Sequence, residues 1–279
     1  MSTGNSRSGR RYCGSLKAVV FDWAGTIVDY GSCAPAGVFI EVFKRRGVTI
    51  SQAEARAPMG MEKRAHLSAI AAVPEIRQRW QNANESGITE RDIDQMYAEF
   101  LPLQIACLPQ YADLISGTLE LVEGCRRRGM KIGTSTGYAR VLMDVLVPEA
   151  AQRGLRVDVV VTADEVPQGR PAPWMCIENA KRLGIWPMQA LAVVDDTIPG
   201  VEAGLNAGMW TVAVAKSGNE LGLSFGEIAA LSATDCQHRL DAAYNRFLDS
   251  GAHYVVDTVA QLMPVLDDIE ARLRRGETP

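Results

Sequence analysis

The chain has 279 residues, 47% hydrophobic and 22% charged, which is the composition of a globular protein with a sizeable core. Its formal net charge of -4 speaks against nucleic acid or an anionic membrane surface as a partner, but it is compatible with a small anionic ligand. The six cysteines include no CxxC pair, so we predict neither a zinc site nor a disulfide framework.

The N-terminus and the lack of long apolar segments favour a cytoplasmic protein. Residues 1–15 are rich in Ser, Gly and Arg and lack the apolar run of a secretory signal, so we expect a disordered N-terminus there. No segment approaches the roughly 18 apolar residues that a membrane-spanning helix needs. Reduced cysteines fit the same compartment.

Six short apolar runs are predicted to be strands: residues 16–21, 131–133, 157–161, 191–194, 210–215 and 253–256. They are rich in Val and Ile without strict alternation, which is typical of parallel strands covered on both faces. Helical periodicity separates them, at residues 116–128, 138–149, 174–183, 201–207 and 236–248. This alternation predicts an α/β fold with a doubly wound, Rossmann-like parallel sheet, in which ligands bind at the carboxyl ends of the strands.

A helical block interrupts this alternation directly after the first strand. Its predicted helices are residues 36–46, 52–57, 61–71, 75–84 and 89–107. Thr89 and Asp92 resemble a capping box, and the helix at 36–46 has an apolar face that could belong to the cap's core or to an interface. We therefore expect a Rossmann-like core domain from residues 16–30 and 114–272, with a helical cap domain from residues 31–113 inserted over the sheet.

Side chains able to do chemistry follow four of the strands. They are Asp22 after the first, the run from Thr134 to Gly137 after the second, Arg170 after the third, and Asp195 with Asp196 after the fourth. Each alone is weak evidence, because acids and hydroxyls commonly form turns and a lone Arg is usually solvated. Two consecutive acids, however, repel each other unless a cation lies between them and Asp22, and hard oxygen ligands of this kind suit Mg²⁺.

This ordered set of acid, hydroxyl, cation and acid pair resembles the four motifs of the haloacid dehalogenase superfamily, over about residues 16–260. The resemblance implies that Asp22 attacks phosphorus and becomes an aspartyl phosphate, while Thr136 and Arg170 hold the phosphoryl oxygens. It also implies a bound Mg²⁺, with ligands from Asp22, the backbone carbonyl of Ala24, Asp196 and, in or near the same shell, Asp195.

Two positions depart from the superfamily's usual pattern. Phosphatases and phosphomutases carry a second Asp two residues after the nucleophile, as acid and base for the ester oxygen, whereas this chain has Ala24. A phosphate monoester hydrolase would be impaired by this change, but an enzyme with a carbon leaving group would not need that proton donor. Gly200 also stands where many relatives have Asp, which leaves the exact metal ligands open.

A segment of the predicted cap supplies the remaining chemistry. Met59 and Gly60 precede Lys63, and His66 lies on the same helical face as Lys63. A helix Lys alone is normally a solvated charge. Together with the strand-end motifs, however, this segment resembles the phosphonoacetaldehyde hydrolases, and the likeness runs through residues 22–26, 28–31, 58–60, 136–138, 169–171, 173–175 and 206–211.

That likeness implies magnesium-dependent cleavage of the C–P bond of phosphonoacetaldehyde to acetaldehyde and phosphate by a homodimer. Lys63 would form a Schiff base with the aldehyde and act as the electron sink. Because the attacking amine must be partly neutral, we expect a lowered pKa for Lys63. Gly137, Tyr138 and Met59 would line the substrate pocket, and His66 would relay protons or merely pack.

Three other functions stay open on these residues. A phosphatase or phosphomutase of the same superfamily is the first, and Ala24 speaks against it. A catalytically silent phosphate-binding protein is the second, but it would need neither Lys63 nor the complete set of strand-end side chains. A haloacid dehalogenase proper is the third, but its chemistry needs neither the metal nor Lys63.

Overall fold

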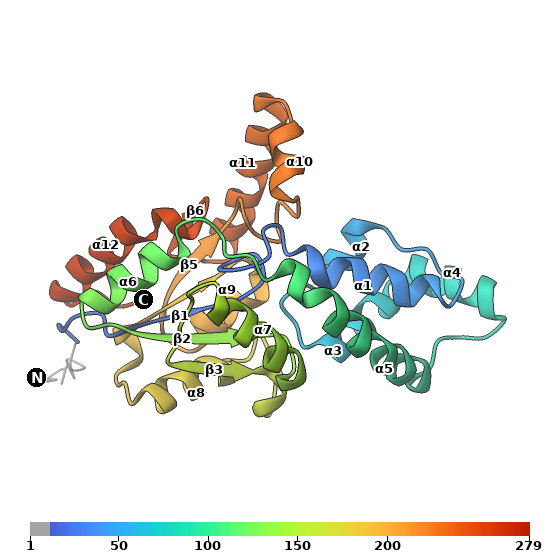
Figure 1. Cartoon of the computed structure of the whole chain (residues 1–279), viewed down its shortest axis with the longest axis horizontal. Coiled ribbons are helices and arrows are strands. Elements are labelled where there is room, and N and C mark those ends of the chain that lie inside the picture. Colours follow the sequence, from blue (N-terminus) through green and yellow to red (C-terminus); the bar gives the residue numbers. More distant parts are fainter. Residues whose placement is uncertain (1–11) are drawn as a thin grey trace, which may run out of the picture.

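The structure, a computed structural model, describes residues 12–279, so the predicted disordered N-terminus falls largely outside the described residues. A six-stranded sheet of order β3-β2-β1-β4-β5-β6, with every neighbouring pair parallel, lies at its centre (Figure 1). In the part of the chain that is described, no helix is long and apolar enough to span a membrane. The strands are β1 (Ala18–Phe21), β2 (Lys131–Thr136), β3 (Val159–Thr162), β4 (Leu191–Asp195), β5 (Trp210–Val214) and β6 (Tyr254–Val256).

Helices cover both faces of the sheet, and they include α6 (Thr118–Arg127), α7 (Arg140–Gln152), α8 (Trp174–Leu183), α9 (Ile198–Asn206) and α12 (Leu262–Arg274). Successive side chains of a strand point to opposite faces. Accordingly, Val19 and Phe21 of β1 pack with α6, α7 and α12, whereas Ala18 and Val20 pack with α8 and α9. The predicted doubly wound α/β fold is confirmed.

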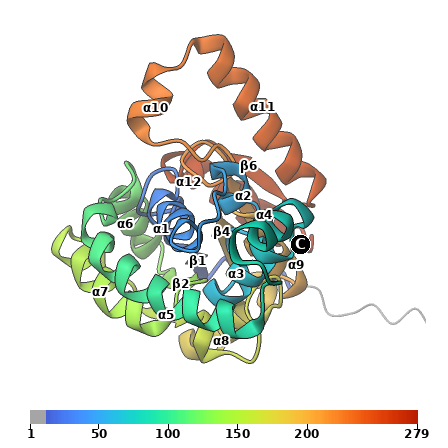
Figure 2. The ribbon, with the colours of Figure 1, turned by 90° about the vertical axis from the view of Figure 1, so that its right-hand side faces the viewer.

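Two further helices form a hairpin, of which only one was predicted from the sequence. Helix α10 (Phe225–Ala230) was not predicted, and α11 (Ala233–Asp249) begins before the predicted residue 236. The hairpin projects away from the sheet, as Figures 1 and 2 show from two directions. No residue of α10 is buried, whereas Leu240, Ala243 and Phe247 anchor the second half of α11.

The helical cap lies beside the carboxyl edge of the sheet and consists of α1 (Cys33–Lys44), α2 (Gln52–Arg56), α3 (Lys63–Ala72), α4 (Pro74–Asn84) and α5 (Glu90–Cys107) (Figure 1). It has a hydrophobic cluster of its own, which includes Phe39, Trp80 and Phe100. The apolar face of α1 contributes to this cluster, so it belongs to the cap's core. Thr89 and Asp92 form the predicted capping box at the start of α5. The exact domain boundaries stay a prediction.

Candidate active site

The predicted strand-end residues meet at the centre of the sheet. β1 lies between β2 and β4, and Phe21 is in register with Thr134 on one side and Val194 on the other. Asp22 therefore emerges between the ends of these two neighbours, beside Ser135 and Asp195. Chains that leave adjacent parallel strands toward opposite faces create a crevice at this point, which is where ligands bind in doubly wound sheets.

A small cavity of about 20 Å³ lies at this crevice, between sheet and cap. Its predicted lining residues are Asp22, Ala24, Met59, Lys63, Thr136, Gly137, Tyr138 and Arg170, and those not predicted are Ser32, Pro35, Gly60 and Thr197. Of the missed residues, Thr197 had a signal, since a Thr before a helix with Pro in its first turn is a typical N-cap. The cavity has room for about one water molecule, so the cap is closed over it.

Two glycines allow the cap and the sheet to lie this close together. A Cβ atom on Gly137, after β2, would lie 2.5 Å from the carbonyl oxygen of Met61. Gly60, which precedes α3, has a φ of +92°, and a Cβ there would lie 2.4 Å from Oγ1 of Thr197. Any side chain at residue 60 or 137 would therefore push the cap away from the strand ends.

Arg170 is the central cation of the site. Its Nη2 lies 2.7 Å from Oδ1 of Asp22 and 2.9 Å from Oδ2 of Asp195, and it donates hydrogen bonds of 3.0 Å to both the carbonyl and the hydroxyl oxygen of Ser135. All of these side chains are buried. The guanidinium group thus fixes the orientation of Asp22, the predicted nucleophile, in a water-poor site.

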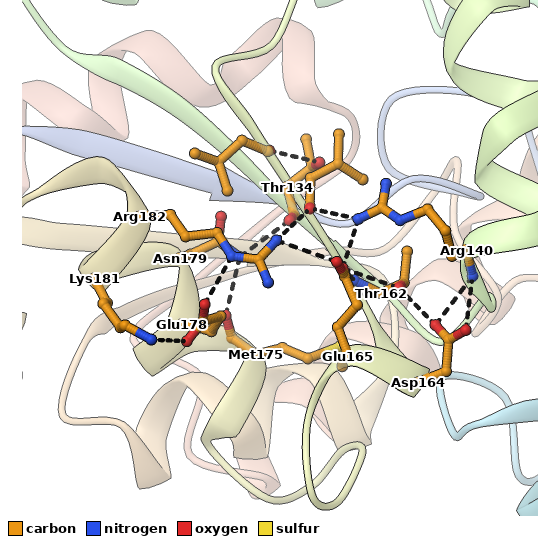
Figure 3. A network of polar contacts seen from close by, with 12 residues as sticks. Thr134, Arg140, Thr162, Asp164, Glu165, Met175, Glu178, Asn179, Lys181 and Arg182 are labelled. Carbon is orange, nitrogen blue, oxygen red and sulfur yellow. Dashed lines mark hydrogen bonds and ion pairs between the residues drawn. The ribbon is translucent and has the colours of Figure 1, made fainter.

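A network of polar contacts surrounds the edge of the sheet from which the loop that carries Arg170 starts (Figure 3). Glu165, just after β3, accepts hydrogen bonds from the backbone N–H of Thr162 (2.9 Å) and from Arg140 of α7 (2.6 Å). The side-chain amide of Asn179 on α8 donates to the carbonyl of Thr134 in β2 (3.0 Å). These contacts tie α7 and α8 to β2 and β3, and so hold the strand ends that position Thr136 and Arg170.

The three buried carboxylates offer a site for a cation. Oxygen atoms of Asp22, Asp195 and Asp196 all lie within 4.8 Å of one another. Burial is the main reason that the pKa values of all three groups are raised, that of Asp195 to about 7, and repulsion by Asp22 adds to it for Asp195 and Asp196. Arg170 compensates one of the three negative charges, so two remain when the carboxylates are ionised. A divalent cation would compensate both, and the oxygen donors are those that Mg²⁺ prefers.

Two hydrogen bonds hold the carboxylate of Asp196 in place. Its Oδ2 accepts a hydrogen bond from the backbone N–H of Asn219 (2.8 Å), and its Oδ1 accepts one from the Thr26 hydroxyl (3.2 Å). Asp195 instead uses its Oδ1 to accept hydrogen bonds from the backbone N–H and the hydroxyl of Thr197 (3.0 and 2.8 Å), and its Oδ2 pairs with Arg170. Asp195 therefore orients Arg170 and the start of α9.

The space around Asp195 explains Gly200. A Cβ atom on Gly200 would lie 2.0 to 2.1 Å from all three atoms of the Asp195 carboxyl group. Gly200 lies in the first turn of α9 and has no positive φ, so space rather than backbone conformation excludes a side chain there. The carboxylate of Asp195 fills the volume that a side chain at position 200 would occupy, and the two residues form a matched pair.

We expect the cost of Gly200→Ala to depend on Asp195. In the native background, overpacking against a buried carboxylate should destabilise the protein by about 1–3 kcal/mol. In an Asp195→Gly background the same change should be neutral or stabilising by about 0.5–1 kcal/mol, because Ala is the better helix residue. Urea unfolding of the four proteins of this double-mutant cycle measures the coupling, and equal effects in both backgrounds would contradict it.

Lys63 is the first residue of α3 and is 3% exposed. Its Nζ lies 4.9 Å from the ring centroid of Tyr138 and 5.7 Å from that of Phe39. Burial lowers the pKa of Lys63 to about 8, and it outweighs the opposing attraction of Asp22. The positive end of the helix dipole also disfavours a cation at this position. The structure thus agrees with the expectation of an amine that is partly neutral near physiological pH.

His66 is not brought to the cavity. Its ring is fully buried and stacks on Phe39 with centroids 3.8 Å apart, and its Nε2 lies 2.8 Å from the carbonyl oxygen of Ala55. Burial, with a smaller contribution from Lys63, holds the pKa of His66 well below its usual value, so the ring is neutral. These contacts support packing within the cap, the second of the two predicted roles.

The lowered pKa of Lys63 also has a consequence for stability. Between pH 8, its pKa in the folded protein, and 10.5, its ordinary value, the unfolded chain binds the extra proton, so folding stability should rise with pH across this window. The rise should total about 3 kcal/mol. We expect Lys63→Met to abolish this contribution, which chemical denaturation of both proteins at pH 7.5 and pH 10 would measure. Parallel pH profiles would show that Lys63 is not desolvated.

Comparison with known proteins agrees with this fold and identifies the class of protein, a hydrolase. A model of the haloacid dehalogenase-like hydrolases matches residues 16–208. A phosphonoacetaldehyde hydrolase from Bacillus cereus is 44% identical over 91% of this chain and 97% of its own length. One from Paraburkholderia phytofirmans is 45% identical over 95% and 99%.

Solved structures show the same relationship. A phosphonoacetaldehyde hydrolase-like protein from Oleispira antarctica superposes with a TM-score of 0.96 at 39% identity, over 98% of this chain and 99% of its own. A β-phosphoglucomutase from Clostridium difficile has a TM-score of 0.65 at 17% identity, over 92% and 98%, and shares the fold alone. The chain belongs to the haloacid dehalogenase-like hydrolases, and within them to the family of the phosphonoacetaldehyde hydrolases.

Proposed function

We propose that this hydrolase cleaves the C–P bond of phosphonoacetaldehyde and releases acetaldehyde and phosphate. One observation carries the proposal: a carboxylate, Asp22, and a desolvated amine, Lys63, line the same small cavity. The activity named for relatives that are 44–45% identical supports the substrate. Ala24 supports a carbon leaving group, because it leaves the cavity without the second carboxyl group that an alkoxide would need.

Lys63 would supply the electron sink. Its neutral amine attacks the aldehyde carbon, and loss of water gives an iminium ion. When the C–P bond breaks, its electron pair moves into the iminium and leaves an enamine. The enamine carbon then takes a proton, and water hydrolyses the new iminium to acetaldehyde and the free amine. The ring of Tyr138, which faces Nζ, would stabilise the cationic iminium.

Asp22 would accept the phosphoryl group. One of its carboxylate oxygens attacks phosphorus as the carbon leaves, and water then hydrolyses the aspartyl phosphate to phosphate. Arg170 holds Asp22 at 2.7 Å and lies where negative charge develops on the phosphoryl oxygens. The Thr136 hydroxyl lines the cavity and would donate a hydrogen bond to one of these oxygens.

Mg²⁺ is the cation that we propose for the acidic cluster. Asp22, Asp196 and the backbone carbonyl of Ala24 would hold it, whereas Asp195 is occupied by Arg170 and Thr197. The ion would neutralise charge on the phosphoryl group during transfer. The residues fit such an ion because two buried negative charges otherwise lack a partner.

Entry of the substrate requires the cap to move. The small cavity has room for about one water molecule, which is less than phosphonoacetaldehyde occupies. We propose that the cap opens to admit the substrate and closes to bring Lys63 to the aldehyde, since Lys63 lies on the cap and Asp22 on the sheet.

The compartment and the oligomeric state of the enzyme are proposed from the family resemblance. We propose a cytoplasmic homodimer, and an interface would cover large apolar side chains such as Trp186 and Phe225, which are 73% and 71% exposed. Light scattering on the purified protein would measure its mass, and a monomer at micromolar concentration would contradict the dimer.

Borohydride reduction should trap the Lys63 intermediate. We expect incubation with phosphonoacetaldehyde and Mg²⁺, followed by reduction and digestion, to leave a two-carbon adduct on the peptide that contains Lys63. Lys63→Arg should give no adduct and lose turnover by at least about 1000-fold, because an iminium can no longer form. Mass spectrometry of the digest measures both outcomes.

Asp22→Asn separates the two halves of the reaction. This variant should still form the trapped lysine adduct, then carrying the intact phosphonate, but release no phosphate, because an amide is a poor nucleophile. If the folded native protein gave no lysine adduct while it hydrolysed a generic phosphate ester, the C–P activity would be wrong and a phosphatase would be the better assignment.

A further inference from the structure

Arg56, the last residue of α2 in the cap, spans the junction between cap and sheet domain. Its Nη1 donates hydrogen bonds to the carbonyl oxygens of Gly31 (2.7 Å) and Ser32 (3.1 Å), which lie directly before α1. The same nitrogen donates to the side-chain oxygen of Asn219 (3.3 Å), which follows β5 in the sheet domain. Arg56 thus contacts both the linker that leads into α1 of the cap and a loop of the core domain.

Asn219 connects this junction to the acidic cluster. Its backbone N–H donates to Oδ2 of Asp196 (2.8 Å), and its side-chain amide returns a long hydrogen bond to the backbone carbonyl of Arg56 (3.5 Å). Asn219 is 8% exposed and Asp196 is fully buried, so water competes little for these contacts. A continuous path of two hydrogen bonds therefore runs from the cap to a carboxylate of the acidic cluster.

The surrounding backbone is shaped to admit Arg56. Gly222 has a φ of +63°, and a Cβ atom there would lie 2.9 Å from Nε of Arg56. Gly31 has a φ of +88°, and its N–H donates to the carbonyl oxygen of Ser217 (2.8 Å) at the start of the same core loop. Gly31 in the linker and Gly222 in the loop at residues 217–223 thus allow both segments to lie close to Arg56.

We propose that Arg56 is a positioning residue that couples closure of the cap to the orientation of Asp196, and hence to binding of the divalent cation. Cap closure places the guanidinium group against Asn219, which fixes the loop whose N–H holds the Asp196 carboxylate. Opening of the cap withdraws Arg56 and leaves that loop freer. The identity of the ion rests on the proposed function, whereas the coupling rests on the hydrogen bonds that link Arg56, Asn219 and Asp196.

The partners of Arg56 support a geometric role. The three acceptors of Nη1 are uncharged, namely the carbonyl oxygens of Gly31 and Ser32 and the amide oxygen of Asn219, so this one nitrogen reaches the linker and the loop together. Removal of the Asn219 side chain would keep the backbone N–H to Asp196 but break the link to the cap.

A double-mutant cycle of Arg56→Ala and Asn219→Ala tests the coupling in the full-length protein. Each single variant should weaken Mg²⁺ binding about 10-fold, the effect typical of residues that orient metal ligands, and the double variant should be no weaker than either single one. Calorimetric titration of the substrate-free protein with Mg²⁺ measures this. Hydrogen exchange should rise in the peptide that contains residues 217–223 in all three variants.

The controls separate coupling from general damage. Arg45→Ala removes another cap arginine, whose partner is Glu41 on the same helix, and should leave both Mg²⁺ affinity and loop exchange unchanged. The Mg²⁺ affinity of Arg56→Lys should lie between those of the native protein and Arg56→Ala. Arg56→Lys also takes the place of Arg56→Ala in the test if the alanine variant folds poorly. Additive losses in the cycle, or an Asn219→Ala variant with native Mg²⁺ affinity, would overturn the proposal. Failure of the lysine trapping alone would overturn the proposed reaction and leave this coupling untouched.

Discussion

The site depends on one charge arrangement, a single guanidinium group buried among three carboxylates at the end of a parallel sheet. Arg170 lies within 3 Å of both Asp22 and Asp195, in a region from which water is largely excluded. Removal of one partner from such a cluster typically costs about 3–5 kcal/mol, because the remaining charges lose their compensation. The cluster is therefore stable only while Arg170 is present, and its remaining negative charge makes a divalent cation favourable.

Burial has opposite consequences for the two reactive groups. The same desolvation raises the pKa of Asp22 and lowers that of Lys63, because both groups are charged in water and lose solvation in the closed site. Arg170 counteracts this for the carboxylate, which stays available as a nucleophile. For Lys63, burial outweighs the attraction of Asp22, and nearby Arg170 lowers the pKa further, so its amine is partly neutral. One closed environment thus prepares a nucleophilic carboxylate and a nucleophilic amine.

Most of the sheet and the cap could be predicted from the sequence, because apolar runs and helical periodicity report directly on burial. The strand-end side chains were found for the same reason, since each follows a strand. Helix α12, which was not predicted, has Leu262, Leu266, Ile269 and Leu273 at helical spacing, so the sequence does contain a signal for it. Helix α10 buries nothing and leaves no apolar pattern to detect. The contacts of Arg56 and Asn219 depend on tertiary approach, which no local pattern encodes.

The departures from the superfamily's pattern acquire a physical meaning only in three dimensions. In the sequence, Asp195 and Gly200 are two separate departures from the superfamily's pattern, because an acid is gained at one position and lost at the other. In space the carboxylate of the first fills the volume beside the second, so position 200 can carry a side chain only if Asp195 changes as well. Ala24 differs. Among the described residues that line the cavity, only Asp22 has a carboxyl group, so nothing replaces the one that is missing at position 24. A compensated change preserves the chemistry of a site, whereas an uncompensated one alters it, and on that ground Ala24 is the stronger evidence for a distinct reaction.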